Sequence, residues 1–178
     1  MFYSSVSLLR VQPLKTGVGY GMIVFRINKG RTAMRISTKG LYAIRMLLDL
    51  AEHQNCGNIA LKDIADRQQI SKKYLEQIIP VLNNAGVLRT VRGSLGGYQL
   101  AGTPDKYTVG DILRLTEGSL SPVPCAAEAD PDCTLSSQCA VLPVWQGLNK
   151  VITDYLDSIT LQDILDRSRE LAANDYVI

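Results

Sequence analysis

The feature that most constrains the fold is a change in hydrophobic period near residue 87. Before it, apolar residues recur every three or four positions in three successive segments, which is typical of amphipathic helices. After it, the runs Val87–Val91 and Tyr98–Ala101 flank the glycine-rich stretch Arg92–Gly97 and predict an antiparallel hairpin. The chain should therefore fold as three helices followed by a two-stranded hairpin.

The first two helices have clear boundaries in the sequence. The first begins at Thr38, where Ser37 or Thr38 can cap it, and it should fray near Gly57. The second is predicted over Leu61–Arg67. The apolar positions expected to face inward are Leu41, Ile44, Leu47, Leu48 and Ala51 in the first helix, and Leu61, Ile64 and Ala65 in the second.

The third helix follows a tight turn at Gln68–Ile70. Ser71 is a favourable N-cap, and Asn84 and Gly86 are typical end signals. Pro80 lies inside this helix and predicts a kink or an early weakening. The expected buried positions are Leu75, Ile78, Ile79 and Leu82.

The rest of the chain is predicted to be helical around one long loop. Thr108 and Asp111 form a capping-box pattern that opens a helix through Glu117. The stretch 118–138 is predicted to be a loop, because it carries three prolines. A long helix follows from about Leu142 to Asp157, and Thr160 caps a short last helix over residues 161–171.

These elements predict a mainly α fold with a small β-hairpin wing, a winged helix-turn-helix joined to a long C-terminal dimerisation helix. We expect a winged helix-turn-helix domain over 34–118, a cysteine-containing sensor loop over 119–141, and the dimerisation helix with the C-terminal helix over 142–178. Residues 1–33 lack helical signals and are expected to be a disordered or non-native extension, with Met34 as the natural start.

Charge is distributed unevenly along the 178 residues. The net charge of +2 divides into +5 over 1–33, +4 over 34–110 and −7 over 111–178. A basic half followed by an acidic half favours a module that binds a polyanion. No run of 18 apolar residues exists, so no membrane partner is expected. Four cysteines, three of them clustered, favour a reducing compartment and hence the cytoplasm.

The polar residues of the third helix and the hairpin suit double-stranded DNA. In a winged helix-turn-helix, the helix after the turn enters the major groove. Hydroxyl, ammonium, amide and carboxylate groups can then contact phosphates and base edges, and a guanidinium at the hairpin suits the minor groove. The predicted DNA-binding residues are Ser71, Lys72, Lys73, Tyr74, Glu76, Gln77, Arg92 and Gly93. The alternative is an ordinary solvated helix face beside a plain turn.

The long C-terminal helix carries an apolar stripe that favours a homodimer. The stripe includes Trp145, Leu148, Ile152 and Tyr155. It is more apolar than a lone peripheral helix requires, and twofold dimers are the usual oligomers. The alternative is that part of the stripe packs on its own domain.

Several stretches resemble the Rrf-two family of bacterial transcription regulators. They are MRISTKGLYAIRM at 34–46, LKDIADRQQISKKYLEQII at 61–79, VRGSLGGYQLA at 91–101, TVGDILRLTEG at 108–118, SPV at 121–123 and LDSITLQDIL at 156–165. The resemblance implies a homodimeric winged-helix DNA-binding repressor or activator. It also places DNA readout on Ser71, Lys73, Tyr74, Glu76 and Gln77, with Arg92 as the wing contact.

Cys125, Cys133 and Cys139 are spaced C-x7-C-x5-C in the predicted loop. Thiolates suit iron–sulfur clusters, zinc or copper, and the residues alone leave open a cluster, a zinc site with one acid, a redox disulfide or free thiols. Cluster-binding members of the family have three cysteines in this loop, so the resemblance implies that these three ligate iron, in a 2Fe–2S rather than a 4Fe–4S cluster. Cys56 stands apart and is expected to be an ordinary residue.

The fourth ligand departs from the family pattern. Some members use a His shortly after the third Cys, where this chain has Ala140, Val141 and Leu142. Others use an acidic residue near the start of the first helix, where this chain has Leu41. The remaining candidates are an acid in the loop (Glu128, Asp130 or Asp132), an exogenous thiol, or water. His53, the only histidine, is expected to be a helix-terminal residue and not a ligand.

These observations predict a cluster-gated DNA-binding regulator. The alternative is a cluster-free regulator of cysteine and sulfur metabolism gated by a partner protein, as the resemblance also allows. An enzyme is not expected, because the chain has no Ser–His–acid set, HExxH motif, phosphate-binding glycine loop or CxxC.

Overall fold

The computed structural model describes residues 36–93, 96–127, 133 and 138–174. The predictions for residues 1–33 and for the acids Glu128, Asp130 and Asp132 lie outside the described residues, as do Ser94 and Leu95 at the hairpin tip. Within the described ranges, no helix is both long and apolar enough to cross a membrane.

The first three helices form as the sequence predicts. They are α1 (Thr38–Glu52), α2 (Leu61–Gln68) and α3 (Lys72–Asn84). The Ser37 side chain caps α1 by accepting hydrogen bonds from two backbone N–H groups, and Ser71 caps α3 in the same way with one. These local hydrogen bonds explain why both starts could be placed from sequence.

Pro80 lies inside α3, at the position where the sequence predicts a kink or an early weakening. The helix continues from Pro80 to Asn84. Pro80 itself is exposed, while Ile79 and Leu82 on either side of it are buried. Packing of these two side chains against the core offsets the hydrogen bond that proline cannot donate.

The hairpin consists of β1 (Leu88–Val91) and β2 (Gly97–Leu100), which pair antiparallel with Leu88 opposite Leu100. On its other edge, β2 exchanges two backbone hydrogen bonds with Ile59, of 3.1 and 2.9 Å through Tyr98. A Cβ on Gly97 would lie 2.5 Å from the Ile59 carbonyl oxygen. The close approach of these two backbones therefore requires glycine at 97.

The C-terminal half contains α4 (Val109–Glu117), α5 (Pro124–Ala127), α6 (Leu142–Asp157) and α7 (Leu161–Asn174). The predicted capping box at the start of α4 is present in full. Two expectations need correction: the short helix α5 lies inside the stretch predicted to be a loop, and α7 extends past the predicted end at Leu171. Two short 3-10 turns complete the order, η1 (Gln54–Cys56) and η2 (Pro104–Lys106).

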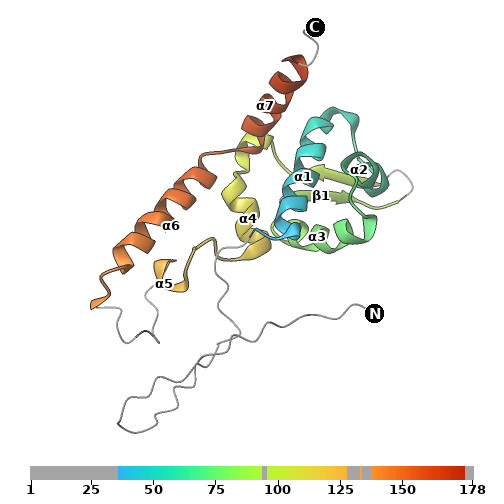
Figure 1. The fold of residues 1–178 in the computed structure, drawn as a ribbon. Coiled ribbons are helices and arrows are strands. Elements are labelled where there is room, and N and C mark those ends of the chain that lie inside the picture. The colour runs from blue at the N-terminus through green and yellow to red at the C-terminus, as the bar shows by residue number, and fades with distance from the viewer. Residues whose placement is uncertain (1–35, 94–95, 128–132, 134–137, 175–178) are drawn as a thin grey trace, which may run out of the picture. The chain divides into compact units, whose positions relative to one another are not determined.

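The hydrophobic core lies between α1 and the elements that surround it. α1 contacts α2, α3, α4, α7 and β2 (Figure 1). Side chains with no exposed surface include Met46, Leu47, Leu50, Ile64, Leu75, Ile78 and Leu82. Leu41 was expected to face inward but is 50% exposed, because the buried face of α1 runs through Gly40, Ala43 and Leu47.

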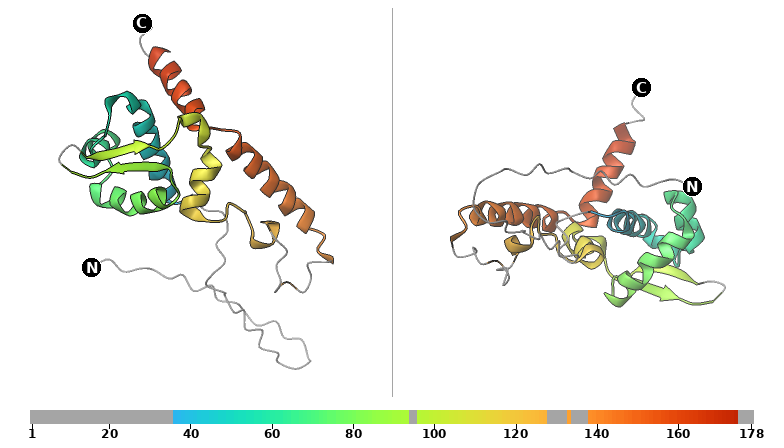
Figure 2. Two further views of the ribbon diagram at one scale, coloured as in Figure 1. Left: turned by 180° about the vertical axis from the view of Figure 1, so that it is seen from behind. Right: turned by 60° about the horizontal axis from the view of Figure 1, so that its bottom comes forward.

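α6 lies along α4 and α5, on the opposite side of α4 from α1 and α3 (Figures 1 and 2). None of its side chains is buried. α7 turns back to α1, against which it buries Leu161 and Leu165. The fold therefore joins a well-packed helix-turn-helix body to a long helix that is covered on one side only.

Candidate nucleic-acid interface and cysteine segment

α3 presents a polar face to solvent because its apolar residues are committed to the core. Leu75 and Ile78 have no exposed surface, and Ile79 is also buried. The helix is amphipathic, so the residues between them point outward. The exposed predicted residues are Ser71, Lys72, Lys73, Glu76 and Gln77. The structure thus brings five of the six predicted α3 residues to one solvent-facing surface.

Tyr74 differs from its neighbours because its ring packs against another aromatic ring. It is half-buried and meets the ring of Tyr42 edge-to-face, with centroids 5.2 Å apart and planes at 79°. The guanidinium of Arg45 lies 5.8 Å from the centroid of the same Tyr42 ring. The Tyr42–Tyr74 contact stabilises α3 against α1, whereas the Arg45–Tyr42 contact lies within α1. Tyr74 therefore has a structural contact that its assignment to DNA did not anticipate.

The exposed face carries both signs of charge. The Lys72 ammonium lies 3.9 Å from the Glu76 carboxylate, one helical turn away. Lys73 has no such acidic neighbour among the described ion pairs. A long, exposed pair of this kind is weak and can open when a stronger partner arrives. Lys73 is therefore the cation of this face most readily available to a phosphate.

The wing is attached to the end of α3. The Thr90 hydroxyl on β1 donates a 2.9 Å hydrogen bond to the side-chain oxygen of Asn83 on α3. Arg92 and Gly93 follow β1 and are exposed. Gly93 has a φ of +113°, a conformation that favours glycine. Strand β1 of the wing and helix α3 therefore lie side by side (Figure 2).

A buried carboxylate holds α2 and the turn before α3 in place. Asp49 on α1 is 1% exposed and accepts hydrogen bonds from Arg67 Nε at 2.9 Å, from Arg67 Nη2 at 2.7 Å and from Gln68 Nε2 at 3.2 Å. Hydrogen bonding to Asp49 raises the pKa of the Arg67 guanidinium. Arg45 donates to the side-chain and backbone oxygens of Gln68. Sequence reasoning missed this network, since a lone Asp in a helix does not reveal its partners.

The cysteine segment is not assembled into a metal site in the described residues. Cys125, Cys133 and Cys139 are free and half-buried. No group of three His, Cys, Asp or Glu side chains within the described ranges lies close enough together to hold a metal ion. Their thiol chemistry fits an iron–sulfur cluster, but the arrangement does not gather them.

Two of the three cysteines are connected to α6. Cys125 belongs to α5, which packs against α6, and the Cys139 carbonyl accepts a 3.2 Å hydrogen bond from the backbone N–H of Leu142. Cys56 and His53, which were not expected to be ligands, lie elsewhere. Cys56 is exposed in η1, and His53 lies at the C-terminal end of α1, as expected, with Nδ1 2.8 Å from the Asp49 carbonyl oxygen.

α6 carries more of the exposed large apolar residues than any other described helix. Val144 is 62% exposed, Val151 65% and Tyr155 60%, and Leu148 lies between them on the same face. Of the predicted stripe, Trp145 is more covered than these residues, and Ile152 is half-buried. Contiguous apolar surface of this kind is unusual unless another surface covers it. Val144 and Val151 were not among the residues predicted for this role.

A helix-turn-helix with a polar outer face on its second helix, followed by a hairpin wing, defines a winged-helix DNA-binding regulator. Comparison with known proteins specifies the family. The family model described as Rrf2, iron-dependent transcriptional regulator, matches residues 36–167. The chain belongs to this family, which is the Rrf-two family indicated by its motifs. It is a transcriptional regulator and not an enzyme.

Two relatives illustrate the range of the family. The HTH-type transcriptional regulator CymR of Bacillus subtilis is 38% identical over 131 residues, which cover 74% of this chain and 89% of CymR. The HTH-type transcriptional regulator IscR of Vibrio vulnificus is 32% identical over 142 residues, which cover 80% of this chain and 83% of IscR.

Solved structures of similar proteins have the same fold. The structure of B. subtilis CymR, described as the global cysteine regulator, has a TM-score of 0.59 at 36% identity and covers 75% of this chain and 98% of its own. The structure of T. potens IscR has a TM-score of 0.61 at 42% identity and covers 78% of this chain and 90% of its own. These matches confirm the predicted winged-helix fold class.

Proposed function

We propose that the protein is a homodimeric, sequence-specific repressor that binds promoter DNA with α3 and the wing, and that its cysteine segment senses iron–sulfur or redox status. The observation that carries the DNA-binding part is the solvent-facing polar surface of α3 beside Arg92, on a helix whose other face is buried. Because promoter DNA is its ligand, we place the protein in the cytoplasm.

The side chains of α3 divide between positioning and readout. Ser71 and Lys73, at the start of the helix, suit phosphate contacts, since a hydroxyl and an ammonium donate to phosphate oxygens. Gln77 suits a paired contact to adenine, and Glu76 can accept from the cytosine amino group. Arg92 suits the narrow minor groove beside the wing. Tyr74 is half-buried against Tyr42, and its hydroxyl suits a phosphate contact.

DNA binding is tested with duplexes selected by the purified protein from a random pool. Gln77→Ala should weaken binding to the selected duplex by about 1–3 kcal/mol and relax the preference at a single base pair. Lys150→Ala is the matched control, because Lys150 is an exposed polar residue on α6, away from α3. A wild-type protein that enriches no sequence and shows no salt-dependent binding would refute the proposal.

The exposed face of α6 supports a second copy of this chain as its partner. Twofold dimers are the commonest oligomers, and a dimer presents two copies of α3 to two half-sites of one operator. Leu148→Asp should produce monomers in analytical ultracentrifugation and reduce operator affinity, because it places a charge in the middle of the apolar face. Lys150→Asp, also a new acid on α6, should leave the dimer intact. A dimer unaffected by Leu148→Asp would contradict this assignment.

For the sensing function, Cys125, Cys133 and Cys139 are the residues that would hold an iron–sulfur cluster. Such a group supplies sensitivity to iron supply and to oxidants. Cys125 lies in α5, which packs against α6, and the Cys139 carbonyl bonds the first residue of α6, so a rearrangement of these cysteines would act on the helix that we assign to the dimer. Support comes from the soft donor set and from the description of the matching family as iron-dependent.

Protein purified without oxygen separates the sensing hypotheses. Visible absorption with iron and sulfide assays should detect a cluster in the wild type and in Cys56→Ala, the matched control. Cys125→Ala, Cys133→Ala and Cys139→Ala should each lose it. Stoichiometric zinc without sulfide would refute a cluster and identify a zinc site.

The alternative function is a cluster-free regulator of cysteine or sulfur metabolism gated by a partner protein. One observation favours it: CymR, described as a global cysteine regulator, is a 38% identical relative. Colourless, iron-free protein that still binds its selected duplex would support this alternative.

A further inference from the structure

The corner between α6 and α7 is attached to the start of α4 by backbone and side-chain contacts. Val109 N–H donates to the Ile159 carbonyl at 2.8 Å, and Leu161 N–H donates to the Tyr107 carbonyl at 2.9 Å. These bonds flank an isolated antiparallel bridge between the threonines at 108 and 160. A short sheet-like ladder therefore holds the C-terminal end of α6 to α4. We call the winged-helix part of the protein, α1 to α4 with β1 and β2, the DNA-reading body.

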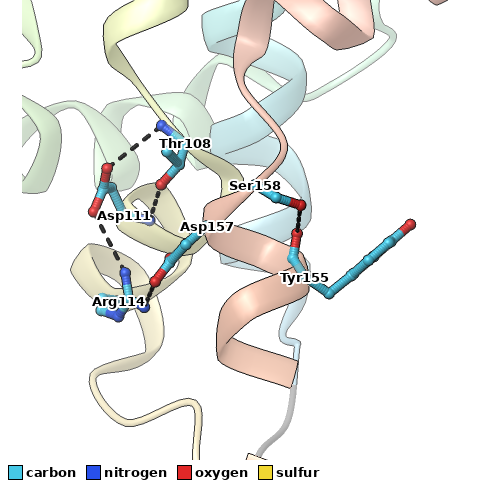
Figure 3. Close-up of polar contacts among 6 residues, drawn as sticks. All are labelled: Thr108, Asp111, Arg114, Tyr155, Asp157 and Ser158. Carbon is cyan, nitrogen blue, oxygen red and sulfur yellow. Dashed lines mark hydrogen bonds and ion pairs between the residues drawn. The ribbon is translucent and has the colours of Figure 1, made fainter. Parts of the chain in front are cut away.

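An ion pair reinforces this ladder. Arg114 on α4 donates from Nη2 to Asp157 Oδ2 on α6 at 2.6 Å, and its Nη1 lies 3.4 Å from Asp111 Oδ1 (Figure 3). Tyr155, two residues earlier on α6, points away from this pair. Within the described residues, Arg114–Asp157 is the one ion pair that joins α6 to another helix, since Lys150–Asp154 lies within α6 itself.

Gly110 makes room for this contact. A Cβ at position 110 would collide with Asp157 Oδ1 and would lie 3.1 Å from Arg114 Nη1. The carboxylate of Asp157 thus rests directly on the backbone of α4. Glycine inside a helix costs about 0.5–1 kcal/mol relative to alanine, and this close approach accounts for its presence here.

We propose that Arg114 and Asp157 are positioning residues that set the angle between α6 and the DNA-reading body, and thereby the separation of the two α3 helices in a dimer. The inference rests on the proposed homodimeric DNA binding. α6 packs against α4 and α5 but buries none of its side chains there, so the contact at its C-terminal end helps to set its direction.

α6 is long enough for a small rotation at its C-terminal end to change the separation of the two α3 helices. A helix of 16 residues is about 24 Å long, so a change of about 10° at the corner moves its far end by about 4 Å. One base-pair step is about 3.4 Å. Loss of the ion pair should therefore allow the dimer to bind half-sites at several spacings. The affinity for a single half-site should not change.

The test measures spacing selectivity and not affinity alone. Four duplexes each carry two copies of the selected half-site. One has the spacing that the wild-type protein selects, and the other three have one base pair removed, one added or two added between the half-sites. Arg114→Gln removes the charge, and Gly110→Ala displaces the Asp157 carboxylate while both charges remain. Lys150→Gln is the control, because it breaks an ion pair of similar length that lies within α6. Affinity for a single half-site is measured for each protein.

The wild type and Lys150→Gln should prefer one spacing by tenfold or more. Arg114→Gln and Gly110→Ala should bind the four spacings within about threefold of one another, with single half-site affinity unchanged. Retention of the wild-type spacing preference by both folded variants overturns the inference. Equal loss of single half-site affinity also overturns it, since that result indicates a general structural role. A wild type that binds no duplex refutes the proposed function instead.

Discussion

Replacing Arg67 with alanine should destabilise the protein more than replacing its partner Asp49. The two residues differ in exposure: the Arg67 side chain is 36% exposed, whereas Asp49 is 1% exposed. Without Arg67, a buried carboxylate keeps only the hydrogen bond from Gln68, and stranding a buried charge costs about 3–5 kcal/mol. Without Asp49, Arg67 can turn to water, so the loss is nearer the value of its hydrogen bonds, about 2–3 kcal/mol.

The double variant gives the sharper test. Once Asp49 is also alanine, no carboxylate is left stranded, so the double variant should be more stable than Arg67→Ala alone. The loss in free energy of unfolding in the double variant should then be smaller than the sum of the two single losses by about 3 kcal/mol.

The assay is urea unfolding of all four proteins followed by circular dichroism at one fixed protein concentration, because a dimer's stability depends on concentration. A parallel cycle on Arg169 and Asp166, an exposed pair on α7, is the control and should show coupling below about 1 kcal/mol. Additive effects in the Asp49–Arg67 cycle would refute the reasoning, because they would mean that removing Arg67 leaves no stranded charge.

Three further predictions concern single positions. Ser71→Ala removes the N-cap of α3 and should lower the free energy of unfolding by about 1 kcal/mol, and an unchanged urea midpoint would contradict this. Lys73→Ala should weaken binding to all duplexes alike and reduce the slope of log affinity against log salt by about 1, whereas a sequence-dependent loss would argue against a phosphate contact. The Thr160 hydroxyl and backbone N–H donate hydrogen bonds to the Asp163 carboxylate and hold the pKa of that carboxyl below its usual range. The ionised carboxylate therefore stabilises the folded protein at pH values above the ordinary carboxyl pKa, and this stabilisation is lost as the pH falls through the lowered pKa of the folded state. Thr160→Val should raise that pKa in an NMR titration, and an unchanged titration would show that the hydroxyl is not its cause.

The sequence predicted the solvent-facing residues of α3 but not the arrangement of the three cysteines. The outward face of α3 was predictable because Leu75, Ile78 and Leu82 mark the buried face, and the residues between them must point the other way. The arrangement of Cys125, Cys133 and Cys139 was not predictable, because no single helical repeat that would fix their relative positions contains all three. Their spacing indicates a type of chemistry and leaves the geometry undetermined.

The sequence by itself determined the order, type and starting points of the main elements. Caps at Ser37, Ser71 and Thr108, together with the periods of 3.6 and 2, act within a few residues, so a local pattern is enough to specify them.

Only the tertiary structure decided which polar residues are buried and which apolar residues remain uncovered. Asp49 and Arg67, or Arg114 and Asp157, are separated by 18 and 43 positions, and a local pattern carries no information about such pairs. The exposure of Val144 and Val151 likewise follows from the side on which α6 rests against α4 and α5. Long-range contacts depend on how completed elements pack together, and this packing places the charges that position α3 and α6.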